Sequence, residues 1–262
     1  MKKIGLLITT FIRDNSLYKC LESISQNWNN AYYVIVIDQG NFTNKKDEYL
    51  KEYFNKQSGE YMQIPFDTGA LKARNIAIKR FKELNIPYIL MMADSIRFKS
   101  IYDFTNIVSF LEQEENNFLC GLNLTNRITW ECDLKKTDKF ELDSPKRKPI
   151  NYNNSYFQPV DICRNFFLAK TDLLMNSLYD EDRKLGDHES SFWRFKEKEY
   201  KCFYCNQIIA DYIKDYSEEY SKYRKRFSNT YLKQMMEKYK LNKWISYSQD
   251  LKDKWDKEKL DK

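Results

Sequence analysis

The chain has 262 residues, of which 42% are hydrophobic and 16% aromatic, with only 6 glycines and 5 prolines. This composition is typical of a folded protein with a sizeable core, and it excludes a disordered or low-complexity chain. The formal net charge of +6 is modest, and lysine and arginine gather in 135–148 and again after Lys214. Such a charge favours an anionic partner: a nucleotide phosphate, an acidic glycan or a membrane surface.

Several other classes of protein are disfavoured. The chain lacks a basic recognition helix, zinc-finger spacing and RNA-binding aromatic motifs, so we expect no nucleic-acid partner. Its six cysteines are scattered among apolar neighbours, which predicts reduced, buried thiols in a cytoplasmic protein. The apolar run at 4–12 is similar to a signal peptide, but Arg13 and Asp14 interrupt it and no cleavage site follows. No stretch is long enough to span a bilayer.

The first part of the chain alternates apolar runs with amphipathic segments. We predict strands at 3–10, 32–37, 61–65 and 87–92, and helices after Asp14, at 45–56 and after Gly69. Short apolar runs are typical of strands buried on both faces. Their alternation with helices predicts an α/β fold with a parallel sheet and right-handed crossovers.

Polar and aromatic residues stand at the carboxyl ends of these strands. They are Thr9, Thr10, Phe11, Asp38, 66–69, Asp94 and Ser95. Ligands of such sheets bind at this edge, so the residues should converge on one crevice. Arg74, on an intervening helix, is placed to pair with a phosphate, and a surface salt bridge is the alternative.

The second part of the chain predicts more strands and helices. Helical segments are expected at 101–114, 170–177 and 187–198, and strands at 118–124, 127–132, 160–169 and 200–210. The polar segment 133–158 is interpreted as a mobile flap over the crevice, with plain disorder as the alternative. The tail at 212–262 is expected to be helical, and its arginines at 224 and 226 can reach a pyrophosphate.

The most unusual stretch is Asp187-His188-Glu189, which joins two carboxylates and the only histidine of the chain directly after Gly186. Such a cluster suits acid/base chemistry. It stands where a turn leads into a helix, and unpaired backbone N–H groups there favour negative charge. Helix capping therefore explains one of the carboxylates equally well.

In this order the motifs resemble glycosyltransferases of the family 2 type. The resemblance is carried by Thr9-Thr10-Phe11, Asp38, the 66–75 stretch with Gly-Ala-Leu-Lys-Ala-Arg-Asn, Asp94, and the block from Val160 through Asn165-Phe-Phe-Leu-Ala to Gly186-Asp-His-Glu. It spans 4–212, and its later half is more similar to β-1,4-N-acetylgalactosaminyltransferases. It implies the GT-A fold, in which helices cover both faces of a Rossmann-like, mostly parallel sheet, here with a helical C-terminal tail.

The resemblance implies a domain at 1–212, with a nucleotide-binding half at 1–98 and an acceptor and catalytic half at 99–212, followed by an extension at 213–262. Asp38 is expected near the nucleobase, and Asp94 at the ribose and at a metal on the diphosphate. The whole set expected to bind the donor is Thr9, Thr10, Phe11, Arg13, Asp38, Gly69, Arg74, Asp94, Ser95, Arg224 and Arg226. Asp187, His188 and Glu189 match the segment that supplies the catalytic base, and the sequence does not choose among them.

Dependence on a divalent cation, Mn²⁺ or Mg²⁺, stays open at this point. Ala93 and Ser95 flank Asp94 where relatives usually have further aspartates, and Asp211 stands near the place of a metal-binding histidine in many relatives. Such an ion on a diphosphate needs hard oxygen ligands. Three arginines can partly replace its charge: Arg74, Arg224 and Arg226.

The expected function is that of an inverting hexosyl- or N-acetylhexosaminyltransferase in surface polysaccharide synthesis. It would transfer a sugar from a nucleotide sugar, a UDP-sugar above all, to a glycan or lipid-linked acceptor. It would work in the cytoplasm, or peripherally at the inner face of the membrane. Trp130 and Trp193 are candidates for stacking on sugars, although burial in the core is the commoner fate of tryptophan. The alternatives are a non-catalytic sugar-nucleotide-binding protein and a nucleotidyltransferase, which normally has a glycine-rich phosphate loop that this chain lacks.

Overall fold

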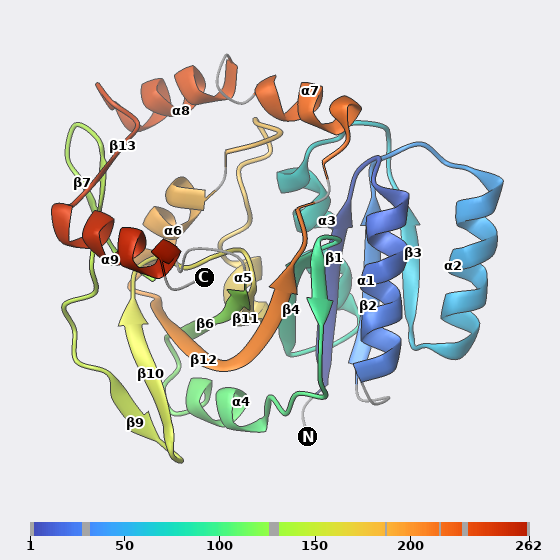
Figure 1. Ribbon diagram of the computed structural model, residues 1–262, viewed down its shortest axis with the longest axis horizontal. Coiled ribbons are helices and arrows are strands. Elements are labelled where there is room, and N and C mark those ends of the chain that lie inside the picture. Colours follow the sequence, from blue (N-terminus) through green and yellow to red (C-terminus); the bar gives the residue numbers. More distant parts are fainter. Residues whose placement is uncertain are drawn as a thin grey trace.

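The structure is a computed structural model that describes residues 3–27, 32–125, 131–186, 188–214, 216–226 and 230–260. Its main sheet consists of β1 (Ile4–Thr10), β2 (Tyr32–Asp38), β3 (Gly59–Gln63), β4 (Tyr88–Ala93), β5 (Ile96–Phe98), β6 (Asn117–Thr125), β9 (Ile150–Tyr152), β10 (Ser155–Val160), β11 (Phe167–Lys170) and β12 (Lys201–Tyr212). Within the described ranges this sheet has ten strands in the order β3-β2-β1-β4-β11-β6-β12-β10-β9, with β5 paired to β12 (Figure 1).

The first half of the sheet is parallel, as the sequence predicts. Strands β3, β2, β1 and β4 lie side by side in parallel register. They are connected through α1 (Asp14–Asn27), α2 (Asn44–Lys56) and α3 (Ala70–Glu83). Every residue of β1 is buried, because helices cover the sheet on both faces. The predicted α/β class is therefore confirmed.

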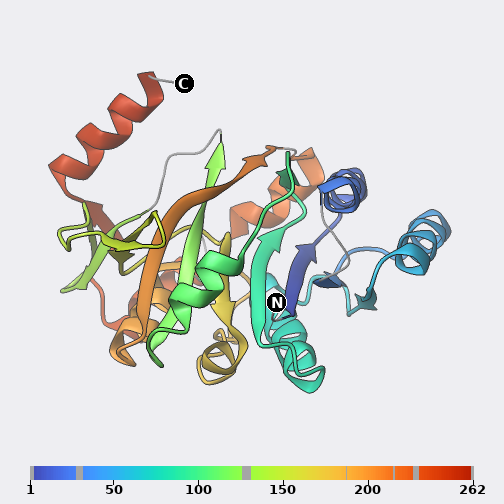
Figure 2. The ribbon, with the colours of Figure 1, turned by 90° about the horizontal axis from the view of Figure 1, so that it is seen from below.

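Two apolar clusters show how the faces of the sheet are covered. Leu6 and Ile8 of β1 point into one cluster, with apolar residues of α1 and α4 (Thr105–Leu111). Leu7 points into the other, with residues of α3, α5 (Thr171–Met175) and α6 (His188–Glu197). This alternation follows from the two-residue period of a strand. Figure 2 shows α1 and α3 on opposite sides of the strands.

In the second half of the sheet the strand directions are mixed. Strand β11 is antiparallel to both of its neighbours, β4 and β6, whereas β12 runs parallel to β6. The strand predicted at 160–169 is broken, since β10 ends at Val160 and β11 begins at Phe167. Between them the Asp161 carboxylate accepts a hydrogen bond from the backbone N–H of Leu134 at 2.9 Å. The predicted helix at 101–114 is also shorter, because α4 begins only at Thr105.

The interpretation of 133–158 as an irregular flap is wrong. This segment contains β7 (Asp133–Lys136), β8 (Phe140–Asp143), β9 and the start of β10. Leu134, Phe140 and Leu142 are almost completely buried, so the alternate residues of β7 and β8 contribute to the core. The predicted strand at 127–132 lies mostly outside the described residues.

The tail after β12 is mainly helical, as predicted, but it also adds a strand. It comprises α7 (Glu218–Arg226), α8 (Leu232–Tyr239), β13 (Ile245–Tyr247) and α9 (Gln249–Leu260). Strand β13 pairs in parallel with β8, which completes a second sheet in the order β13-β8-β7. The tail thus runs along the upper edge of the molecule in Figure 1, from α7 through α8 to β13. In the described parts of the chain we find no helix with the length and apolarity needed to cross a membrane.

Candidate active site

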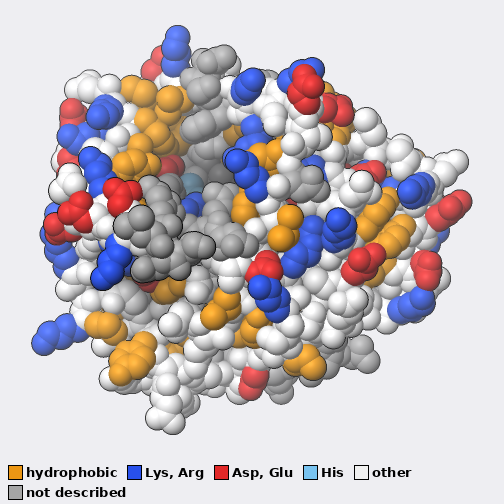
Figure 3. Space-filling view, in the orientation of Figure 1, with side chains coloured by type: hydrophobic (Ala, Val, Ile, Leu, Met, Phe, Trp, Pro, Cys, Tyr) orange, Lys and Arg blue, Asp and Glu red, His pale blue; other side chains and the backbone are white. Residues whose placement is uncertain are grey.

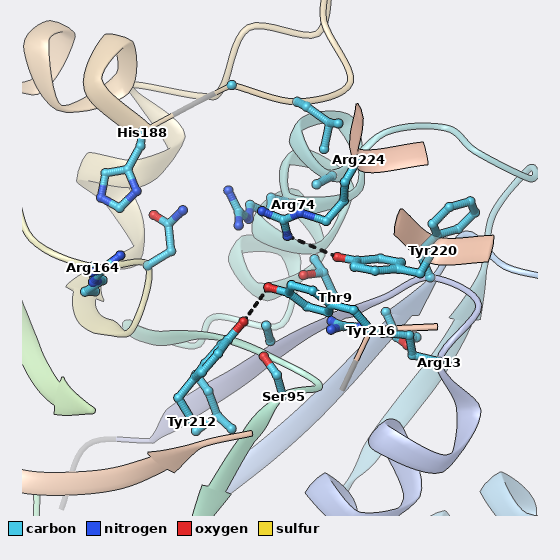
Figure 4. Close-up of a pocket in the computed structure, with 18 of the residues that line it drawn as sticks. Thr9, Arg13, Arg74, Ser95, Arg164, His188, Tyr212, Tyr216, Tyr220 and Arg224 are labelled. Atoms are coloured by element: carbon cyan, nitrogen blue, oxygen red, sulfur yellow. Dashed lines mark hydrogen bonds between the residues drawn. The ribbon is translucent and has the colours of Figure 1, made fainter. Parts of the chain in front are cut away.

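A cavity of about 450 Å³ lies at the carboxyl ends of β1 and β4 (Figures 3 and 4). One wall comes from these strand ends, from α3 and from α7 with the residues that precede it. The other comes from the segment after β10, from the start of α6 and from the residue before β13. The sequence-predicted residues that line the cavity are Thr9, Thr10, Phe11, Arg13, Arg74, Ser95, His188, Glu189 and Arg224.

Each of the other predicted site residues either does not line the cavity or falls outside the residues that the structure describes. Asp38, Gly69 and Asp94 are described, and they stand behind the cavity wall rather than in it. Gly69 precedes α3, and its N–H donates to the Gln39 side chain at 2.6 Å. Asp187 and the side chain of Arg226 lie outside the described residues. The structure thus brings together most of the residues that the sequence placed at the carboxyl ends of the strands.

Asp94 is completely buried and its carboxylate is already bound. One oxygen pairs with the Arg13 guanidinium, and the other accepts a hydrogen bond from the Thr10 hydroxyl at 2.8 Å. Burial raises the pKa of Asp94, and the nearby Arg13 charge works in the opposite direction. In this arrangement Asp94 anchors the residues that face the cavity instead of facing it itself.

The described carboxylates do not form a metal centre. No group of three or more histidine, cysteine, aspartate or glutamate side chains stands close enough to hold an ion in the ranges that the structure describes. Asp211 pairs with Lys99 at 2.8 Å and also accepts a hydrogen bond from Thr125. A divalent ion prefers several accessible oxygen ligands, and the predicted ligand Asp94 is held by Arg13 in this structure.

Asp38 is held in a second buried network. Its oxygens accept hydrogen bonds from the N–H of Gly40 at 2.7 Å, the ammonium of Lys46 at 2.8 Å and the Tyr61 hydroxyl at 3.1 Å. Lys46 is itself almost completely buried and pairs with Asp14 as well. The cavity-lining residue at this strand end is Gln39, which the sequence reasoning missed although it follows Asp38 directly.

Aromatic residues of α7 and of the segment before it close the side of the cavity that Phe11 and Arg13 line. The ring of Phe11 packs edge-on against Tyr223, with centroids 4.9 Å apart, and also contacts Tyr220. The Arg13 guanidinium lies over the Tyr220 ring at 4.4 Å, a cation–π contact. The Arg224 guanidinium lies 5.2 Å from the centroid of the Tyr216 ring, and Figure 4 marks its hydrogen bond to the Tyr220 hydroxyl, at 3.4 Å. Nothing in the sequence pattern singled out these tyrosines.

The opposite wall carries the acid cluster. His188 begins α6, its Nε2 is hydrogen-bonded to the backbone carbonyl of Cys163, and its ring stacks on Phe192. Because a carbonyl only accepts, Nε2 carries the proton. Glu189 lines the same wall and is only 7% exposed. Figure 4 places His188 and Arg164 on the side of the cavity away from Tyr220 and Arg13.

Arg183 holds the loop that leads into this cluster. Its guanidinium is almost completely buried, donates to the backbone carbonyl of Gly186 at 3.1 Å and pairs with Asp180 at 2.7 Å. Gly186 has a φ of 84°, a left-handed conformation that glycine adopts without strain. The loop is therefore fixed by a side chain that the sequence reasoning did not select.

Of the two tryptophans proposed for sugar stacking, Trp193 does not line the cavity. Trp193 packs partly buried in the core beside Phe140, and Trp130 lies outside the described residues. The tryptophan in the cavity wall is Trp244, from the C-terminal extension. It is distant in sequence from every other lining residue of this wall, so no local signal pointed to it.

Solved structures of glycosyltransferases share this fold. They include GalNAc-T7 with UDP, GalNAc and Mn²⁺ (TM-score 0.65, 12% identity, 82% of this chain and 44% of that chain). A second is the mannosyltransferase PcManGT from Pyrobaculum calidifontis with GDP-Man and Mn²⁺ (TM-score 0.60, 10% identity, 92% of this chain and 65% of that chain). A third is S. aureus TarS 1–349 with UDP-GlcNAc (TM-score 0.58, 14% identity, 84% of this chain and 60% of that chain). The chain therefore spans less than two thirds of the length of each.

At these identities the similarity establishes the fold, and the predicted GT-A architecture is confirmed. No curated protein matches the chain. The family model described as glycosyl transferase family 2 matches residues 6–176, which is well over half of the sequence. The chain belongs to glycosyl transferase family 2.

Proposed function

We propose that this chain is an inverting glycosyltransferase that transfers a hexosyl or N-acetylhexosaminyl group from a UDP-sugar to a hydroxyl of a glycan or lipid-linked glycan. One observation carries the proposal: a single cavity joins the strand-end residues of the nucleotide-binding half to His188 and Glu189. Two similar structures contain UDP or UDP-GlcNAc, which supports a UDP-sugar donor. The structure with GDP-Man makes a GDP-sugar the alternative.

In the proposed reaction the acceptor hydroxyl attacks the anomeric carbon as the nucleoside diphosphate departs from the opposite face. A base must take the hydroxyl proton, and positive charge must stabilise the leaving oxygen. Glu189 is our first candidate for the base, with Asp187 as the alternative, and His188 would orient the acceptor or the carboxylate. Arg74 and Arg224 reach the cavity from two different helices and would hold the diphosphate.

A divalent cation is consistent with the Mn²⁺ in two of the similar structures. In this chain Asp94 would have to leave Arg13 before it could bind such an ion, because both of its oxygens are engaged. The arginines of the cavity wall supply positive charge without this rearrangement. No step of the proposed mechanism therefore depends on a metal.

The role in surface polysaccharide synthesis and the location, in the cytoplasm or peripherally at the inner face of the membrane, remain predictions from the resemblance. So does the division into a domain at 1–212 and an extension at 213–262. The pairing of β13 with β8 indicates that the extension folds together with the acceptor half. Deletion of the extension should therefore destabilise the whole chain.

The donor is tested by thermal unfolding and calorimetry with UDP, GDP and CDP, each with and without Mn²⁺. We expect UDP at 100 times its Kd to stabilise the chain by about 2.7 kcal/mol. Uridine, which lacks the diphosphate, is the control and should stabilise it far less, because the arginines have no phosphate to bind. Stabilisation by GDP alone would indicate a GDP-sugar as the donor. If no nucleotide stabilises the chain, the proposed function is contradicted.

The reaction itself separates the transferase from its alternatives. A transferase releases nucleoside diphosphate from a nucleotide sugar, and NMR of the product gives the anomeric configuration. Release of pyrophosphate from a nucleoside triphosphate would identify a nucleotidyltransferase instead. Donor binding without turnover across a panel of glycan acceptors would favour a non-catalytic binding protein.

A further inference from the structure

Trp244 is held firmly at the edge of the cavity. Its backbone carbonyl accepts a hydrogen bond from the N–H of Phe140 at 3.0 Å, which ties it to the first residue of β8. The buried Phe140 ring packs edge-on against the indole, with centroids 5.1 Å apart and planes at 85°. Trp244 is only partly buried and borders the cavity. The core thus supports the residue on one side and leaves another side for a ligand.

The segment that carries Trp244 approaches the acid cluster. The ring of Phe140 contacts Trp244 and also Trp193 of α6, with centroids 5.1 and 6.3 Å apart. Trp244 therefore lies beside the helix that His188 begins. Trp244 lines the cavity from the side of this helix, and Figure 4 shows His188 and Arg164 across the cavity from Tyr220 and Arg13.

This wall combines an aromatic residue with polar groups of several kinds. Arg164 and Asn165 supply N–H donors, Asn165 also supplies a carbonyl acceptor, and Glu189 supplies a carboxylate. A sugar ring matches this combination, because its C–H face packs on an aromatic plane while its hydroxyls point outward to polar partners. An acyl or isoprenoid chain would instead need a continuous apolar groove, and the described residues of this wall are mostly polar.

We infer that Trp244 is the stacking platform for a sugar ring of the acceptor, so that the acceptor is a carbohydrate at the group next to the reacting hydroxyl. The inference rests on the proposed function, which already takes a glycan or lipid-linked glycan as the acceptor, and adds the residue that binds the sugar ring of that acceptor. It also assigns a role to the C-terminal extension, which completes the acceptor side of the cavity through β13. In this geometry Trp244 binds the acceptor, and a residue of the acid cluster takes the proton.

The test uses the full chain with saturating UDP and a set of simple probes: the methyl glycosides of glucose, galactose and N-acetylglucosamine, and their β-linked disaccharides. Saturation-transfer NMR identifies the probes that bind, and titration gives their Kd. Ring stacking on an aromatic side chain contributes substantially to binding, as the stacking of nucleobases on aromatic residues shows. We therefore expect Trp244→Leu to weaken binding of the best probe about tenfold, which corresponds to about 1.4 kcal/mol.

Two further variants separate stacking from folding. Trp244→Phe keeps an aromatic plane and should retain most of the affinity, whereas Trp244→Leu keeps only the apolar contact with Phe140. Trp255→Phe is the matched control, because Trp255 packs on Tyr247 within the same extension and does not line the cavity. It should leave the Kd of the probes unchanged.

Equal affinities of the wild-type chain and Trp244→Leu would overturn the inference. So would binding of UDP without binding of any glycoside or disaccharide. The proposed function fails in a different way, namely if the wild-type chain binds no nucleotide at all. The two failures are therefore read from separate titrations.

Discussion

Glu189→Gln is expected to lower the kcat of sugar transfer by about two to four powers of ten, the usual contribution of a general base. The amide has the size of the carboxylate but cannot take the proton of the acceptor hydroxyl. Glu189 borders the cavity and is almost completely buried, so water is a poor substitute for it. Steady-state kinetics measure the loss, and calorimetry with UDP should show that donor binding is largely intact.

Glu197→Gln is the matched control for this variant. Glu197 stands exposed in the last turn of the same helix, α6, and its replacement should leave kcat within about twofold, because surface substitutions rarely change stability by more than about 0.5 kcal/mol. Asp187→Asn belongs in the same assay as the alternative base. Full activity of both Glu189→Gln and Asp187→Asn would show that the base has been assigned wrongly.

Asp94→Ala is expected to lower the free energy of unfolding by about 3–5 kcal/mol, because it leaves the buried Arg13 without its counter-charge. The Thr10 hydroxyl loses its acceptor in the same step. Since Arg13 also contacts Tyr216 and Tyr220, the segment that covers the donor side should loosen as well. Urea unfolding measures the stability, and limited proteolysis reports on α7.

Two controls show whether the buried pair is responsible. Asp47→Ala removes the partly buried partner of the exposed Lys51 on α2 and should cost no more than about 0.5 kcal/mol. The double variant Arg13→Met and Asp94→Leu removes both charges and should regain most of the stability. A small loss of stability in Asp94→Ala, together with loss of Mn²⁺ binding, would instead identify Asp94 as a metal ligand.

The buried networks explain why residue roles are harder to predict than residue positions. A strand-end aspartate in a Rossmann-like sheet is normally expected to face the ligand, and both Asp38 and Asp94 stand at such ends. Here each of them is paired with a cation from a neighbouring segment, Lys46 or Arg13, and lies behind the cavity wall. Whether a carboxylate faces inward or outward depends on these partners, which strand periodicity does not reveal.

The sequence by itself determined the parallel half of the sheet and the edge at which the cavity lies. Apolar runs of strand length, separated by amphipathic helices, allow few other arrangements, and parallel strands place their carboxyl ends together. Local patterns are sufficient there, because each strand and helix shows its own periodicity. The convergence of Thr9, Phe11, Ser95 and Arg74 on one cavity follows from that topology.

Only the tertiary structure decided how β8, β13 and Trp244 are arranged next to the cavity. Segment 133–158 looks irregular in sequence, yet β8 pairs with β7 and also with β13, about a hundred residues later, and the core covers Phe140 and Leu142. The pairing with β13 brings Trp244 to the cavity that Glu189 also lines. Short strands of this kind are stabilised by distant partners rather than by their own propensity, so neither the strand nor the tryptophan at the cavity could be read from the sequence.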